Sequence, residues 1–389
     1  MKITRLVIFA VFILTFIVNQ NILGCSLIKI TINGKTIVGN NEDFGNHDTR
    51  IWFEPGDNQH YGVVYVGYDD LFPEGGMNEA GLVFDAFGVS NKPLKDTLGK
   101  EPIFELDLKR KIMTECATAE EVMALINKYN LYYWSHSVWV FLDKNGKYLI
   151  VDGDSKVLGD NSYFVQTNFR QSEVVDESRI DCSRYKKAMS LLEGHNETSI
   201  EYCTSVMDSV HQNSTLYTTV YDLNNAIIYL YYFHNYKKAI RFDLKEELKK
   251  GARILVIPEL FPEEKTNDYI QSRVLKSRID SLANISPAVD SVTKKELRER
   301  WYIPHIIANH GYGYLHRKDI PNAIAIFNLF IELFPQLPYG YDFLGEAYME
   351  EKQYQLALTN YQKSIELDPN YINGKQRIDV LKKLIEKRE

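Results

Sequence analysis

Cys25 is the residue of this 389-residue chain whose position suggests covalent chemistry. Lys2 and Arg5 precede an apolar run over 6–18, polar residues follow, and Gly24 stands directly before the cysteine. This order is typical of a secretory signal segment, and cleavage after Gly24 would make Cys25 the first residue. An N-terminal cysteine carries a thiol nucleophile and an α-amine, whose pKa of about 8 in peptides lets it accept the thiol proton. The predicted nucleophile therefore brings its own base and needs no histidine partner.

Four short motifs after Cys25 carry polar side chains that such a nucleophile could use. They are Gly39-Asn40-Asn41-Glu42-Asp43, Gly76-Met77-Asn78-Glu79-Ala80-Gly81-Leu82, Thr167-Asn168 and Ser183-Arg184-Tyr185. Together with Cys25-Ser26, they resemble in sequence and order the motifs of the choloylglycine hydrolase and penicillin V acylase family. That family of N-terminal-nucleophile hydrolases is grouped with linear amide C–N hydrolases and with acyl-transferring, acid ceramidase-like enzymes. The resemblance covers roughly residues 25–261.

The resemblance implies a catalytic set and a reaction. Cys25 would attack an amide carbonyl, and Asp43 would hold the α-amine and orient the cysteine. Asn168 would stabilise the developing oxyanion, and Arg184 would lower the pKa of the thiol. The implied reaction hydrolyses a linear, non-peptide amide of a small N-acyl substrate through a thioester, without a metal or organic cofactor. The residues expected to contact the substrate are Asn40, Asn41, Met77, Asn78, Phe87 and Gly88.

Two positions depart from the bile salt hydrolases of that family. Those enzymes have an arginine where this chain has Asn40. They also have a second oxyanion asparagine where this chain has Phe87 or Gly88, so that a backbone N–H would replace it. Both differences argue against a specialist for bile salts.

Two other functions remain open from the sequence. The segment Ile22-Leu23-Gly24-Cys25 also resembles a bacterial lipobox, and a lipid on Cys25 would block the nucleophile. The chain would then be a lipid-anchored binding or scaffold protein, and lipidation would be its link to a membrane. Alternatively, an acyltransferase would pass the acyl group of the same thioester to an amine or alcohol.

The C-terminal part of the chain contains an internal repeat of 34 residues. Its landmarks, in two copies, are Gly311, Tyr314, Ala323, Phe327 and Pro335, then Gly345, Tyr348, Ala357, Tyr361 and Pro369. Small and aromatic residues at this period are typical of tetratricopeptide repeats, in which paired helices stack. Two repeats are predicted, with a capping helix over 372–387 and a groove that could bind a protein or peptide partner.

The elements that position Cys25 are predicted to be mainly strands. The patterns predict a hairpin over 26–38, strands at 51–53, 62–68, 82–87, 137–141, 148–151, 214–220, 226–232 and 239–242, and helices at 119–129 and 184–192. Periodicity alone supports a mixed, strand-rich domain. The resemblance implies the α+β class and a four-layer αββα sandwich, followed by the all-α repeats.

The predicted organisation has four parts. They are a signal peptide at 1–24, a catalytic domain at 25–261, a helical connector at 262–303 and the repeats with their cap at 304–389. The formal net charge of −7, without a basic stripe, argues against nucleic acid as a partner. Cys116, Cys182 and Cys203 are expected to be small buried residues. The leader predicts export to the periplasm, cell surface or medium of a bacterium.

Overall fold

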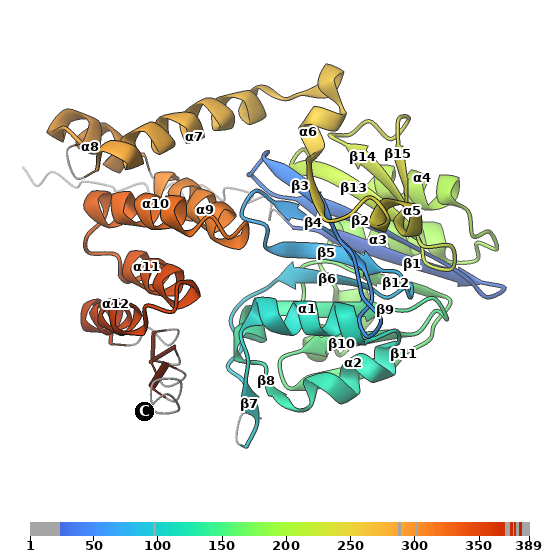
Figure 1. Cartoon of the computed structure of the whole chain (residues 1–389). Coiled ribbons are helices and arrows are strands. Elements are labelled where there is room, and N and C mark those ends of the chain that lie inside the picture. Colours follow the sequence, from blue (N-terminus) through green and yellow to red (C-terminus); the bar gives the residue numbers. More distant parts are fainter. Residues whose placement is uncertain are drawn as a thin grey trace, which may run out of the picture.

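Two antiparallel sheets form the core of the part of the chain before α7 (Asn267–Ile285), and the later helices lie to one side of it (Figure 1). The computed structural model describes residues 24–95, 99–286, 289–300, 302–369, 374–375, 377–378 and 381–382. All but the last residue of the predicted signal peptide, and most of the predicted capping helix, therefore lie outside the described residues. Within the described part, no helix is long and apolar enough to cross a membrane.

The first sheet has six strands and the second has eight. In spatial order, the first contains β12 (Tyr163–Gln166), β1 (Ser26–Ile32), β2 (Lys35–Asp43), β13 (Thr215–Asp222), β14 (Ile227–Tyr232) and β15 (Ile240–Asp243). The second contains β11 (Ser155–Gly159), β10 (Tyr148–Asp152), β9 (Ser137–Leu142), β6 (Val83–Gly88), β5 (Pro73–Asn78), β4 (Val63–Tyr68), β3 (Thr49–Glu54) and β16 (Arg253–Val256). A short parallel pair, β7 (Glu101–Pro102) and β8 (Tyr129–Asn130), lies apart.

The predicted N-terminal hairpin is confirmed. Strands β1 and β2 pair in antiparallel register, and the turn between them has positive φ angles at Asn33 (52°) and Gly34 (77°). An Asn-Gly pair is favoured there because a two-residue hairpin turn of this kind needs left-handed backbone at both positions. The turn fixes the register and, with it, the face on which each residue of β2 lies.

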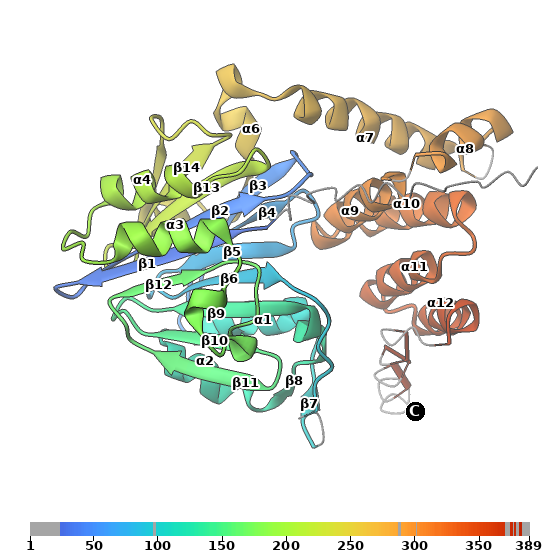
Figure 2. The same cartoon turned by 180° about the vertical axis from the view of Figure 1, so that it is seen from behind.

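Helices cover the outer face of each sheet and complete the four layers. One apolar cluster, which includes Leu27, Val38 and Met77, fills the space between the sheets. A second packs α1 (Glu105–Glu115) and α2 (Ala119–Ile126) on the eight-stranded sheet. A third packs α3 (Ser183–Leu192) and α4 (Ile200–Val210) on the six-stranded sheet. Figure 2 shows α3 and α4 from their own side. The predicted αββα sandwich is confirmed.

The C-terminal part is helical. After the short helices α5 (Leu244–Leu248) and α6 (Ile257–Leu260), the chain forms α7 (Asn267–Ile285), α8 (Ser291–Arg298), α9 (Ile303–His316), α10 (Ile320–Leu333), α11 (Pro338–Glu350) and α12 (Tyr354–Leu367). A Cβ on Gly311 would lie 2.3 Å from the ring of Phe327, and one on Gly345 would lie 2.5 Å from that of Tyr361. The landmark glycines thus let each helix pair approach closely, as the repeat pattern predicts.

The helical part is joined to the sandwich by a buried ionic network. Lys276 of α7 is almost fully buried and donates to Asp48 (2.9 Å) and to Asp69, which lie in loops of the sandwich. The ring of His316 in α9 hydrogen-bonds to the backbone oxygen of Asp70. Since burying three charged groups is unfavourable unless they are paired, this network ties the connector helix to the sandwich.

Several elements were not predicted, among them β11, β12, β16 and α4, and two more show why. The segment that contains Gly75 and Gly76 reads as a turn but forms strand β5. Glycine is needed there because a Cβ on Gly76 would lie 2.5 Å from the backbone oxygen of Val64 on the neighbouring strand. Helix α1 was also missed; it buries only Leu108, Lys109, Ile112 and Met113.

Candidate active site

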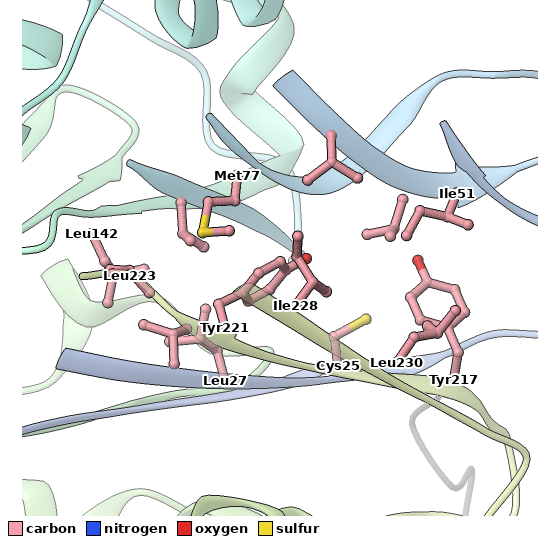
Figure 3. Packing of buried hydrophobic residues seen from close by; sticks show 14 of the residues in the cluster. Cys25, Leu27, Ile51, Met77, Leu142, Tyr217, Tyr221, Leu223, Ile228 and Leu230 are labelled. Carbon is pink, nitrogen blue, oxygen red and sulfur yellow. The ribbon is translucent and has the colours of Figure 1, made fainter. Parts of the chain in front are cut away.

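Cys25 lies directly before β1, at the end of the six-stranded sheet. Along this strand, Cys25 and Leu27 face the space between the sheets, whereas Ile28 faces the outer helices. Figure 3 shows the sulfur of Cys25 pointing into that space, on the same side as the ring of Tyr217. The side chain is buried, with 9% of the residue exposed. The thiol therefore occupies the interior of the sandwich.

The peptide before the thiol is held by two side chains from distant parts of the chain. Arg184 Nη1 donates to the backbone oxygen of Gly24, to that of Cys25 (2.6 Å) and to the hydroxyl of Ser26 (2.7 Å). Gln212 Nε2 also donates to the Gly24 oxygen, at 2.9 Å. Two donors thus converge on the carbonyl of the bond at which the leader is predicted to be cut.

Asp43 lies at the end of β2, next to this peptide. Its carboxylate accepts hydrogen bonds from Thr215 Oγ1 and from Gln212 Nε2 (2.8 Å), and it lies 3.8 Å from Arg184 Nη1. Burial raises the pKa of Asp43, and these hydrogen bonds and the Arg184 charge oppose that rise. Gln212 thus links this carboxylate to the carbonyl of the Gly24–Cys25 bond.

Asn168 follows β12 and lies against the same peptide. Its Oδ1 accepts from Arg184 Nη2 at 3.4 Å, and its Nδ2 donates to the backbone oxygen of Gly88 at 3.1 Å. A Cβ on Gly24 would lie 2.0 Å from Asn168 Oδ1. The structure therefore brings Asn168, Arg184 and Asp43 together around Cys25.

The environment of Cys25 favours the neutral thiol. Burial raises its pKa well above the usual range, and the nearby carboxyl groups of Glu42 and Asp85 raise it further. A hydrogen bond from the backbone N–H of Asp43 acts in the opposite direction. A group that removes the thiol proton is thus required before attack.

A cavity of about 740 Å³ lies on the Gly24 side of the site. Asn168, Arg184 and Gln212 contribute to its wall, and the remainder comes largely from the charged segment 170–183. Cys25 is not part of the wall, because its side chain points to the other side of the peptide.

The residues predicted to contact the substrate are divided between different layers. Asn40, Met77 and Phe87 are buried on the side of their strands that faces the space between the sheets, and Gly88 is exposed at the end of β6. The Oδ1 atom of Asn40 has no hydrogen-bond partner within the described residues. These four remain candidates for substrate contact.

Asn41 and Asn78 are not brought to the thiol. Asn41 donates to the backbone oxygen of Met207 in α4 (3.0 Å) and accepts from Thr218 (2.6 Å). Asn78 donates to the backbone of Met113 and Cys116 in and after α1. Both side chains point to the outer helix layers because strand residues alternate between faces. Their prediction as substrate contacts is corrected to a role in joining strands to helices.

Several residues at the site were not predicted from the sequence. Gln212 and Thr215 approach Asp43 from the segment after α4, more than 160 residues away in the chain. Glu42 and Tyr68 lie beside the thiol, and Tyr68 donates to Glu42 at 2.6 Å. No local pattern marks Gln212 or Thr215, whereas Glu42 stands inside a motif that was already selected.

A known family of repeats matches the C-terminal part of this chain. A family model described as tetratricopeptide repeat matches residues 338–371, the segment that forms α11 and α12. This segment is a tetratricopeptide repeat. The tetratricopeptide repeat-containing protein BH2049 of Halalkalibacterium halodurans is 31% identical over 117 residues, which are 28% of this chain and 52% of that protein. The chain therefore spans about half the length of this relative.

A solved structure of penicillin V acylase from Agrobacterium tumefaciens resembles part of the chain. It covers 59% of this chain and 90% of its own, with 16% sequence identity and a TM-score of 0.46. At this level of likeness, nothing about activity follows.

Proposed function

We propose that the chain, once cut after Gly24, is a cysteine-nucleophile hydrolase of linear amides. Its substrate would be a small N-acyl compound, and the reaction would pass through a thioester on Cys25. The observation that supports this most is the convergence of Arg184, Gln212 and Asp43 on the Gly24–Cys25 peptide. Three polar groups from separate segments meet around one cysteine at the predicted cleavage point.

Removal of Gly24 would turn this arrangement into a site for a substrate carbonyl. The donors of Arg184 and Gln212, which now hold the Gly24 oxygen, would be free to bind another carbonyl oxygen. Fixed donors stabilise the negative charge of a tetrahedral intermediate by a few kcal/mol each. Asn168 lies within reach of the same position. The new α-amine would be held by Asp43.

The burial of Cys25 argues against the lipid-anchored alternative. A lipid on Sγ would have to extend between two packed sheets, where the thiol is surrounded by core residues. A solvent-facing cysteine at the end of a flexible linker would suit lipidation better. The proposed localisation is export without an anchor, with the tetratricopeptide repeats offering a surface for a protein or peptide partner.

The test uses the mature full-length protein, beginning at Cys25, and a panel of N-acyl amides. Cys25→Ala and Cys25→Ser are expected to abolish cleavage, and intact mass should reveal an acyl adduct on wild-type protein quenched in acid. Cys116→Ala is the matched control, since Cys116 is also buried but lies at the C-terminal end of α1, in the outer layer. Turnover like that of wild type by either Cys25 variant would refute the nucleophile. N-terminal sequencing from the native host separates a free Cys25 from a lipidated one.

A further inference from the structure

Glu42 is a buried carboxyl group beside the thiol that the proposed function has not used. In the hairpin, Ser26 pairs with Asn41 and Leu27 with Asn40, so the register places Glu42 beside Cys25. Glu42 and Cys25 point to the same side of the sheet. Each is adjacent in sequence to a residue that faces the helices, and successive strand residues point to opposite faces. The thiol lies close enough to the Glu42 carboxyl group to lower its pKa.

The remaining contacts of Glu42 hold it in place without neutralising its charge. Tyr68, from the opposite sheet, donates to Glu42 Oε1 at 2.6 Å. Tyr217 pairs with Glu42 in the register of β13 and β2, and its hydroxyl has no partner within the described residues. Among those residues, no lysine, arginine or histidine forms an ion pair with Glu42. The carboxyl group therefore lies on the same face of the sheet as the thiol, in a site that disfavours its charged form.

The titratable and charged groups around Glu42 come from every strand packed on it. They are Cys25, Asp43, Tyr68, Glu74, Asp85 and Tyr217, with Lys109 of α1 behind Glu74 and Asp85. Burial, with the charge of Glu74 next, raises the pKa of Glu42 to about 8. A carboxyl group in this range can both accept and donate a proton near neutral pH, which is what acid–base catalysis requires.

We propose that Glu42 carries the proton in the hydrolysis, as base toward the Cys25 thiol and as acid toward the leaving amine. This rests on the proposed function above. The α-amine is the alternative base, but it would lie beside Asp43, whose carboxylate stabilises the protonated ammonium form. The thiol and Glu42 share the interior, whereas Asp43 accepts its hydrogen bonds on the side of Gly24.

The reaction has two halves, acylation of Cys25 and hydrolysis of the thioester, and the protons and electron pairs balance in each. The Glu42 carboxylate takes the proton of Cys25, and the sulfur forms a bond to the substrate carbonyl carbon. The carboxyl group then gives this proton to the amide nitrogen as the C–N bond breaks and the thioester forms. In the second half, Glu42 takes a proton from water while the water oxygen attacks the thioester carbon. The proton returns to sulfur when the C–S bond breaks.

The test compares Glu42→Gln with wild type in two assays on the mature full-length protein. Glutamine keeps the shape of glutamate and still accepts the hydrogen bond from Tyr68, so the fold should be retained. The value of kcat/KM for an acyl amide is expected to fall about 100-fold or more, the usual contribution of a positioned acid–base group. The rise of wild-type kcat/KM through pH of about 8 should disappear in the variant.

Alkylation of Cys25 by iodoacetamide, measured by peptide mass, distinguishes a direct effect of Glu42 on the thiol from a purely structural role of Glu42. Glu42 raises the thiol pKa, so the Glu42→Gln thiol should react faster at pH 8 although hydrolysis is slower. Tyr68→Phe removes a hydrogen bond that lowers the Glu42 pKa and should shift the pH profile of kcat/KM upward.

Two results overturn the proposal, and they are distinct from failure of the proposed function. Hydrolysis by Glu42→Gln with the rate and pH profile of wild type would assign the base to the α-amine. Unchanged alkylation of Cys25 in this variant would show that Glu42 does not interact with the thiol, whether or not a substrate is known. Failure of the wild-type protein to cleave any acyl amide would instead reject the proposed function.

Discussion

Replacing Glu42 with glutamine should make the protein more stable than wild type, and this gain should grow as the pH rises from about 5 to 8. The usual pKa of this carboxyl group is 4.5, and in the folded protein burial raises it to about 8. Between these values the folded state holds a proton that the unfolded state has lost. The free energy of unfolding of wild type therefore falls with rising pH over this window, and glutamine removes this contribution.

The size of the effect follows from the same pKa change. Each pKa unit corresponds to about 1.4 kcal/mol, and pH 7 lies 2.5 units above 4.5. The variant should thus gain on the order of 3 kcal/mol over wild type at pH 7 and almost nothing at pH 4.5. Glu42→Gln is expected to lower activity and raise stability, because a buried acid–base group supports catalysis but destabilises the folded state.

Urea unfolding, followed by tryptophan fluorescence at pH 5 and pH 7.5, measures this difference. Trp52, Trp134 and Trp139 are buried in the sandwich and report its unfolding. Glu246→Gln, at an exposed site paired with Lys249, is the control and should change the free energy of unfolding by less than about 1 kcal/mol. A gain for Glu42→Gln that stays constant or shrinks from pH 5 to 7.5 would refute the buried, neutral state of Glu42.

Three further outcomes are expected. Asp43→Asn and Arg184→Ala should each lower turnover at least roughly tenfold, or about 1.4 kcal/mol, in the acyl-amide assay; full activity would remove them from the site. Lys276→Met leaves Asp69 buried without its cation and Asp48 paired with Arg50, and it should lower the free energy of unfolding by about 3 kcal/mol or more, whereas the exposed Lys249→Met should change it little; equal losses would contradict the network. Gly345→Leu forces a side chain into the ring of Tyr361 and should reduce stability by about 1–3 kcal/mol in thermal unfolding, whereas Gly45→Ala, with open space around it, should not.

The parts of the fold that the sequence predicts are those set by short-range rules. Alternation along β2, the Asn33-Gly34 turn and the 34-residue spacing of the repeats each depend on residues close together in the chain. Strand β5 was not predicted because its glycines read as a turn. They are required by the close approach of β4, which is seen only in the assembled sheet. The buried contact of Lys276 with Asp48 joins residues 228 apart, and no local pattern marks either partner as buried.

The site shows the same division, and one strand explains both its success and its errors. Cys25, Asp43, Asn168 and Arg184 were selected by motif and do lie together, although the motif says nothing of Gln212 and Thr215. Within Gly39-Asn40-Asn41-Glu42-Asp43, a family resemblance treats the residues as one unit, but a strand divides them between two faces. Val38 is apolar and faces the opposite sheet. Counting by two from Val38 places Asn40 and Glu42 with the thiol and sends Asn41 to α4, so the strand period alone would have exchanged Asn41 for Glu42 as the residue to test.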